Sequence, residues 1–207
     1  MGIYVGDKRY APYIGDKRRR YMGGVSSFPY DAEVEHVHGS TIYDTGIAIT
    51  SDAGFDAVIA IDAYTHNAGV FGYTPDAGKV NRIFMYNNRI VIQRGAYGAT
   101  GRNNIAFDTD FHRYVLNETT AQIDDSVNTS GTTADTNRNF YLFACWGTYS
   151  ADQRAQSIKS MKLYHGSTLM MDLIPVRKGT HGYFWDNISQ ALIGNENTNW
   201  EPGPDKT

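Results

Sequence analysis

From residue 25 onward, short apolar runs alternate with clusters of Gly, Asn, Asp and Thr, and this rhythm limits the possible fold more than any other feature. The runs are rich in β-branched and aromatic residues and too short for ordinary helices. Only Ser150–Ser157 has a pattern that predicts a short helix. Many short strands separated by turn residues are typical of a sandwich or jelly roll. We therefore expect an all-β fold, an antiparallel two-sheet jelly-roll sandwich.

Two hairpins can be placed from their turn residues. Arg82–Tyr86 and Arg89–Gln93 flank Asn87-Asn88, a dipeptide that tolerates the positive φ angles of a two-residue turn. Ser160–Tyr164 alternates between apolar and polar residues, and after a short turn Thr168–Val176 returns as a second strand. Gly182–Asp186 follows as a further strand, in which Phe184 and Trp185 are expected to be buried.

The first two dozen residues differ from the rest of the chain. Val5–Arg9 recurs as Ile14–Arg18, and each copy places a Gly-Asp turn after a β-branched residue, which predicts a small hairpin. We expect a short N-terminal segment over residues 1–24, the sandwich over 25–200 and a loose tail over 201–207.

Charge and cysteine content exclude several classes of protein. With 22 acidic and 19 basic residues the net charge is −3, which does not predict nucleic-acid binding. The single cysteine, Cys145, lies in an apolar run and is expected to be a buried thiol, as in a protein made in a reducing cytoplasm. We find no signal-peptide pattern and no membrane span, so we expect cytoplasmic synthesis and, after release, a location in a virion or outside the cell.

The C-terminal strands carry a resemblance to a known family. Lys159–Arg177 has a strand ending in Tyr, a turn and a strand ending Asp-Leu-Ile-Pro, and Gly182–Asn187 continues with a glycine, aromatic residues and an aspartate. Phe111–Leu116 and Ala121–Asp125 add a matching pair of strands. This block resembles the closing strands of concanavalin A-like (laminin-G-like) lectin and glucanase-fold domains of phage and prophage tail or minor structural proteins. The hairpin is more aromatic than the Gly-Leu-Tyr-Asp that is frequent in that family.

The resemblance implies a concanavalin A-like jelly roll but leaves its function open, because this fold hosts lectins, hydrolases and architectural modules. Hydrolysis of a glycoside needs two carboxyl groups about 5–10 Å apart. The chain has only a few glutamates, and none belongs to the Glu-x-Asp-x-x-Glu pattern of β-glucanases of this fold. They are Glu33, Glu35, Glu118, Glu196 and Glu201. We expect no enzymatic activity.

We expect the protein to require no cofactor, but the sequence offers candidate ligands for calcium and for zinc. Calcium takes oxygen ligands, and two acidic clusters in expected loops could supply them. The candidate ligands are Asp108, Asp110, Asp124 and Asp125. His36 and His38 alternate along one strand as in some zinc sites, which would need a third ligand such as Asp44 or His66.

Aromatic residues make up 13% of the chain, and several stand beside Gly, Asn, Ser or Thr in expected loops. A sugar ring presents a C–H face to an exposed aromatic ring, while polar side chains bind its hydroxyls. The candidate ligand-binding residues are Tyr64, Tyr73, Tyr97, Tyr149 and Trp200.

These features predict a non-enzymatic, lectin-like adhesion module of a phage or prophage tail structure, with a bacterial cell-surface glycan as its partner. The alternative is a purely structural particle protein that contacts other tail proteins or forms a homo-oligomer. A divergent glycoside hydrolase is a third hypothesis.

Overall fold

The structure is a computed structural model in which the chain divides into two compact units, Met1–Tyr30 and Asp31–Thr207. In the first unit, β1 (Ile3–Val5) pairs antiparallel with β2 (Lys8–Tyr10), so the first Gly-Asp copy does connect two paired strands. β3 (Tyr21–Met22) pairs with β2. The second copy lies outside the described residues. The structure describes residues 3–5, 8–10, 21–22, 28–73, 79–96, 101–133, 135, 138–146, 151–153 and 155–207.

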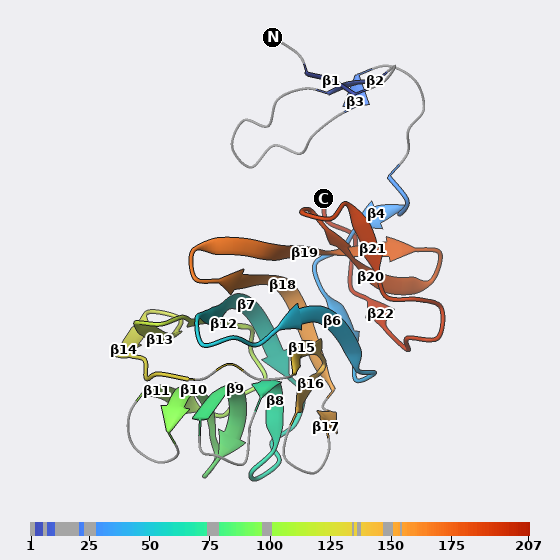
Figure 1. Cartoon of the computed structure of the whole chain (residues 1–207). Helices are drawn as coiled ribbons and strands as arrows, with labels where there is room; N and C mark the ends of the chain where they lie inside the picture. Colours follow the sequence, from blue (N-terminus) through green and yellow to red (C-terminus); the bar gives the residue numbers. More distant parts are fainter. Residues whose placement is uncertain are drawn as a thin grey trace. The chain divides into compact units, whose positions relative to one another are not determined.

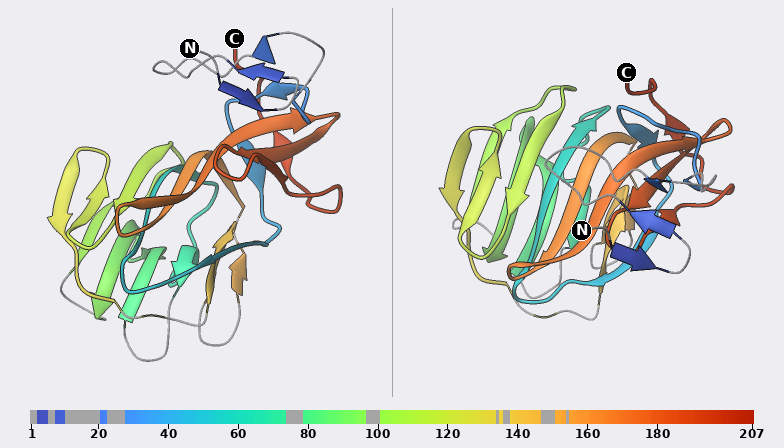
Figure 2. Two further views of the ribbon diagram at one scale, coloured as in Figure 1. Left: turned by 45° about the horizontal axis from the view of Figure 1, so that its top comes forward. Right: turned by 90° about the horizontal axis from the view of Figure 1, so that it is seen from above.

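The second unit is built on an 11-stranded antiparallel sheet (Figure 1). Its main path, in spatial order, is β14 (Ser126–Thr129), β13 (Thr120–Ile123), β12 (His112–Leu116), β7 (Ala53–Ile61), β18 (Gln156–His165), β19 (Thr168–Lys178), β20 (His181–Asp186) and β21 (Ala191–Ile193). Three further strands complete it: β5 (Val37–Gly39) beside β18, β22 (Glu201–Pro202) beside β5, and β4 (Ala32–Glu33) beside β19. Figure 2 (right) looks onto this sheet, from the yellow edge at β13 and β14 to orange β18 and β19.

A six-stranded sheet lies below strands β7, β12 and β18 in Figure 1. Its strands are β11 (Arg102–Ala106), β10 (Arg89–Ala96), β9 (Lys79–Tyr86), β8 (Gly69–Tyr73), β16 (Ala144–Trp146) and β17 (Ala151–Gln153). All pairs are antiparallel except β16 with β8. A two-stranded sheet of β6 (Tyr43–Ala48) and β15 (Asn139–Leu142) lies beside it.

Aromatic rings join the two large sheets. Phe55 of β7 meets Phe71 of β8 edge to face at a ring-centroid distance of 5.0 Å. Phe140 of β15 stacks on Phe71 at 5.5 Å with nearly parallel rings. All three side chains are fully buried, so residues from three sheets form one core. Such ring pairs add about 0.5–1.5 kcal/mol each beyond the area that they bury.

The sheets also approach one another at the edge formed by β11 and β14. Asn103 of β11 donates a side-chain hydrogen bond to the carbonyl oxygen of Ser126, and Asn128 donates one to the carbonyl of Arg102 at 3.1 Å. These side-chain hydrogen bonds join β11 of the six-stranded sheet to β14 of the long sheet.

The predicted hairpins are confirmed. Arg89 pairs with Tyr86, and the turn residues Asn87 and Asn88 have φ angles of 48° and 57°. β18 and β19 form the C-terminal hairpin, with Gly166 in its turn. Phe184 is fully buried, as expected, and Trp185 and Cys145 are also buried.

One prediction of secondary structure is wrong. The helix expected at 150–157 is absent: Ala151–Gln153 forms β17, and Gln156 begins β18. The fully buried amide of Gln156 donates to the carbonyl of Val70 at 3.2 Å, so tertiary packing overrides local helix propensity.

The C-terminal tail is extended but not loose. β22 pairs with β5, and the backbone N–H of Glu35 donates to the carbonyl of Pro204 at 2.8 Å. Every regular element among the described residues is a strand, so the all-β expectation is confirmed. Within the same residues, no helix has the length and apolar character that a membrane crossing needs.

Removal of the Phe71 ring should reveal how far the fold depends on the contact between the sheets. We expect Phe71→Ala to lower the free energy of unfolding by about 3–5 kcal/mol, because a large side chain leaves a cavity between two rings. Ile188→Ala, at a position 50% exposed, serves as the control and should change it by less than about 0.5 kcal/mol. Urea unfolding measures both; equal small effects would show that the ring contacts do not hold the sheets together.

Candidate functional site

One end of the second unit brings together three connections that the sequence places far apart. We call it the rim: residues 62–68 between β7 and β8, the β9–β10 turn at 87–88 and residues 107–111 between β11 and β12, together with the adjoining residues Tyr86, His112 and Asp124. The Asn88 N–H donates to the Tyr64 hydroxyl at 2.8 Å, and the Phe107 N–H donates to the Asn88 carbonyl at 3.0 Å. These hydrogen bonds fix the three segments against one another.

Aromatic rings line one side of the rim. Tyr64 meets Phe107 edge to face at 5.6 Å, and its hydroxyl is hydrogen-bonded to Nδ1 of His66 at 3.1 Å. The ring of His66 lies 5.3 Å from that of Tyr86, tilted by 30°. Tyr86, the last residue of β9, is 39% exposed. The rim therefore presents two adjacent exposed rings on a hydrogen-bonded support.

Amide groups stand next to these rings. Asn87 and Asn88 are both exposed, and their positive φ angles hold them in the tight turn directly after Tyr86. Asn67, also exposed and at φ 59°, lies on the neighbouring connection after His66. Asn is among the residues that adopt this conformation readily, and its side chain both donates and accepts hydrogen bonds.

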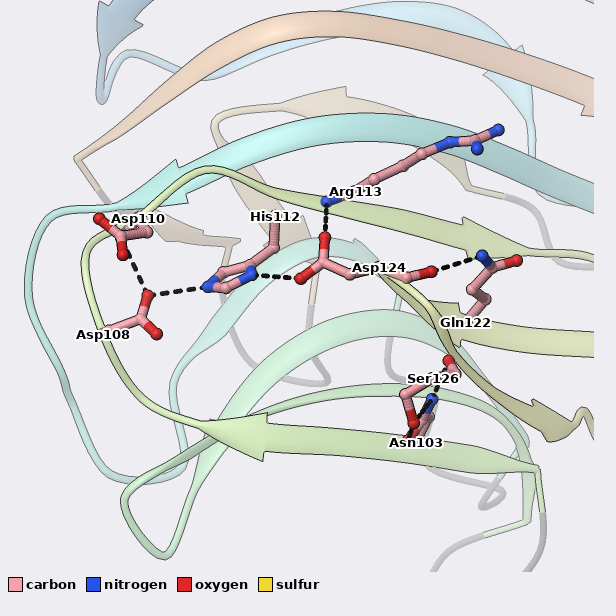
Figure 3. Close-up of polar contacts among 8 residues, drawn as sticks. All are labelled: Asn103, Asp108, Asp110, His112, Arg113, Gln122, Asp124 and Ser126. Atoms are coloured by element: carbon pink, nitrogen blue, oxygen red, sulfur yellow. Dashed lines mark hydrogen bonds and ion pairs between the residues drawn. The ribbon is translucent and has the colours of Figure 1, made fainter.

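A histidine held between two aspartates forms the other side of the rim (Figure 3). His112 Nδ1 lies 2.6 Å from Asp124 Oδ2, and its Nε2 lies 2.8 Å from Asp108 Oδ1. Backbone amides orient both carboxylates: Asp110 N–H donates to Asp108 at 2.9 Å and Arg113 N–H donates to Asp124 at 2.8 Å. Because a carboxylate only accepts, both ring nitrogens donate when the imidazole is doubly protonated.

The electrostatics agree with this protonation state. Burial alone lowers the pKa of His112, but the hydrogen bonds and charges of Asp108 and Asp124 outweigh it, so the pKa is raised above 6.5. The hydrogen bond from His112 lowers the pKa of Asp108. A protonated ring has no lone pair with which to act as a base or bind a metal.

The structure thus brings together two of the four aspartates proposed for calcium, but with His112 between them. The two ring nitrogens point in divergent directions, so Asp108 and Asp124 bind opposite edges of the ring and do not converge on one point. Asp110 and Asp125 are exposed, and the described residues contain no group of three or more His, Cys, Asp or Glu side chains that could hold a metal ion. These residues do not fit a calcium cage, and calcium binding stays an untested prediction.

The residues proposed as zinc ligands each contact different neighbours. His38 approaches Ser157 through Nδ1 at 3.2 Å and Asp62 through Nε2 at 3.6 Å. His36 packs against Phe111 at 5.5 Å between ring centroids. Asp44 accepts hydrogen bonds from Gly46 and Asn139, and His66 belongs to the aromatic side of the rim.

Of the aromatic residues that were expected to bind a ligand, Tyr64 lies in the rim and Tyr73 is half-buried against the core. Tyr97 and Tyr149 lie outside the described residues. The interpretation of Trp200 as an exposed ring is wrong: it is 1% exposed, and its indole N–H donates to the carbonyl of Thr41 at 3.1 Å.

Glycines make room for Trp200. A Cβ atom on Gly39 would lie 2.6 Å from its ring, and one on Gly194 would lie 2.7 Å from it. The polar neighbours of Trp200 in the sequence do not reveal this packing. Sequence reasoning also missed Tyr86, although its position as the last residue before an Asn-Asn turn was a usable signal.

The pH dependence of stability should report the state of His112. Its raised pKa means that the protonated ring contributes stability that is fully present below 6.5 and is lost as the pH rises through the folded-state value. We expect the stability difference between wild type and His112→Gln to be largest near about pH 5.5 and to shrink toward about pH 9. Urea unfolding across this range gives the difference, and the other histidines cancel in it. A difference that grows with pH would contradict a protonated His112.

No protein-family model matches the chain, and no curated protein matches it. The candidate site consists of the exposed rings of His66 and Tyr86, the adjacent amides of Asn87 and Asn88, and the carboxylates fixed by His112.

Proposed function

We propose that the protein is a non-enzymatic carbohydrate-binding module that binds a glycan at the rim. The observation that carries this proposal is the exposed ring pair of His66 and Tyr86, set beside the amides of Asn87 and Asn88. One face of a sugar ring carries C–H groups that stack on such a ring, and its edge carries hydroxyls that need donors and acceptors. Rigid aromatic rings with adaptable polar neighbours are typical of polar recognition surfaces.

The hydrogen bonds within the rim favour binding. Tyr64 is held by Asn88 and His66, so ligand binding need not order these segments at that moment. A site that is already ordered loses less conformational entropy on binding. The carboxylate of Asp108, fixed by His112, adds an acceptor for hydroxyl groups on the neighbouring side.

The resemblance of residues 159–187 supports a more specific proposal. We infer a concanavalin A-like jelly roll, and the two packed sheets are compatible with that architecture. In the phage and prophage tail proteins that this block resembles, such a module would act as an adhesin. A bacterial cell-surface glycan is therefore the first ligand to test.

Hydrolysis is less well supported by the geometry. Asp108 and Asp124 face one another, as a catalytic pair would, but the imidazole of His112 fills the space between them. A general acid needs a raised carboxyl pKa, whereas the hydrogen bond from His112 lowers that of Asp108.

A purely architectural role predicts a broad apolar surface. Among the described residues, the exposed large hydrophobic side chains are Tyr86, Val127 and Ile188, on β9, on β14 and after β20. They lie on separate elements and do not form such a patch, so we favour the glycan-binding role.

Substitution of Tyr86 tests the proposal. On a broad glycan array with the purified protein, we expect saturable binding that Tyr86→Ala weakens about tenfold or more, because a stacked aromatic anchor contributes about 1–2 kcal/mol. Tyr86→Phe keeps the ring and should keep most of the affinity. Binding should persist when calcium is removed with a chelator, since the aspartates of the rim are held by His112.

Tyr164→Ala is the matched control, because Tyr164 pairs with Gly54 at the end of β7 opposite the rim. It should leave glycan binding unchanged. Absence of any glycan signal from the folded protein would overturn the proposal, and self-association detected by light scattering would then favour the architectural role. Equal losses of glycan affinity in Tyr86→Ala and Tyr164→Ala would show that the binding site does not lie at the rim.

A further inference from the structure

The backbone of the connection between β7 and β8 holds His66 beside Tyr86. The Ala68 N–H donates to the carbonyl of Thr65 at 3.2 Å, which closes a turn around His66. The Met85 N–H donates to the carbonyl of Ala68 at 2.8 Å, and this bond ties the turn to β9 directly before Tyr86. Main-chain hydrogen bonds therefore set the position of the imidazole next to the exposed phenol ring.

Two hydrogen bonds meet at the hydroxyl of Tyr64. The Asn88 N–H lies 2.8 Å from it, and Nδ1 of His66 lies 3.1 Å from it. A backbone N–H only donates, so the hydroxyl oxygen accepts from Asn88. The hydroxyl proton then remains available for Nδ1 of His66, which is the other hydrogen-bond partner of Tyr64 within the described part of the chain.

This arrangement selects one tautomer of His66. If Nδ1–H donated to Tyr64 instead, the hydroxyl proton would be left without an acceptor in the described residues. Hydrogen bonds that run in one direction, here from amide to hydroxyl to imidazole, polarise and strengthen one another. In a neutral imidazole one nitrogen accepts and the other carries the proton. Because Nδ1 accepts from Tyr64, Nε2 carries the proton.

The Nε2–H of His66 is free to meet a ligand. Among the described residues, His66 contacts only Tyr64, through Nδ1, and Tyr86, through the faces of the two rings, and neither contact engages Nε2. The side chain is exposed. Since the two nitrogens of an imidazole point in divergent directions, Nε2–H is directed away from Tyr64 and stands beside the ring of Tyr86.

We propose that His66 donates a hydrogen bond from Nε2 to an acceptor oxygen of the bound glycan, and that Tyr64 is the positioning residue that keeps the imidazole in the required tautomer. The inference rests on the proposed glycan-binding role of the rim and adds a hydrogen bond to the ring contact of His66. It selects glycans that place a hydroxyl, carbonyl or carboxylate oxygen next to the C–H face that stacks on Tyr86.

His66→Phe separates the donor from the ring, because phenylalanine keeps an aromatic side chain beside Tyr86 but has no N–H. The affinity is measured for each glycan of a broad array that binds the wild type. We expect His66→Phe to weaken this binding about fivefold or more, the effect of losing one neutral hydrogen bond. Unchanged affinity would show that His66 contributes only its ring and would overturn the proposal.

Tyr64→Phe tests the positioning role. It keeps the ring that meets Phe107 and removes the hydroxyl that holds His66. We expect it to weaken binding of the same glycans, by no more than His66→Phe does. Tyr43→Phe is the matched control, since Tyr43 is also a half-buried tyrosine but packs against Trp200. It should keep the wild-type affinity.

NMR spectra of the ring nitrogens report the tautomer in the free protein. Neutral His66 should show a protonated Nε2 and an unprotonated Nδ1, and Tyr64→Phe, but not Tyr43→Phe, should shift the Nδ1 resonance. A proton on Nδ1 in the wild type would overturn the proposal whether or not a glycan binds. The expected spectrum together with silence on the array would instead overturn the glycan-binding role, so the two failures are distinguishable.

Discussion

The fold depends on the covering of one face of the long sheet by the six-stranded sheet. β7 lies in the middle of the long sheet between β12 and β18; only Asp56 and Val58 in its centre are partly exposed, and its other side chains are buried. Phe55 from this strand meets Phe71 and Phe140, so one aromatic cluster ties three sheets together. Without this cover, a row of Ala, Ile and Phe side chains would face water, at a cost of about 25 cal/mol for each Å² exposed.

Much of this arrangement could be predicted from the sequence because the responsible forces are local. Asn87-Asn88 specifies a hairpin turn by its tolerance of positive φ, and the strands on either side follow from it. The helix expected at 150–157 failed for the opposite reason. Gln156 is placed by its partners Ile61 and Val70, which are distant in sequence, and no local pattern reports them.

In the candidate site, too, local features could be predicted from the sequence but the partners of each residue could not. Tyr64 was found because it stands in a connection between strands, but its partners Asn88 and Phe107 come from two other connections. Asp108 and Asp124 were found as acidic residues, whereas the sequence could not show that His112 lies between them. Residue type predicts which chemistry is available, and only the pairing of β12 with β7 and β13 decides which groups meet.

The two ends of the core hold a positively charged side chain in different surroundings. At the rim, His112 has a carboxylate on each side, and backbone amides hold those carboxylates, so the charge is matched by the protein itself. At the other end, Arg94 has one carbonyl partner and two unmatched donors in a place where glycines bring three backbone segments together. Replacement of such a charge by an apolar side chain is often neutral or stabilising, so a fold that only needed packing would be served by methionine or leucine there.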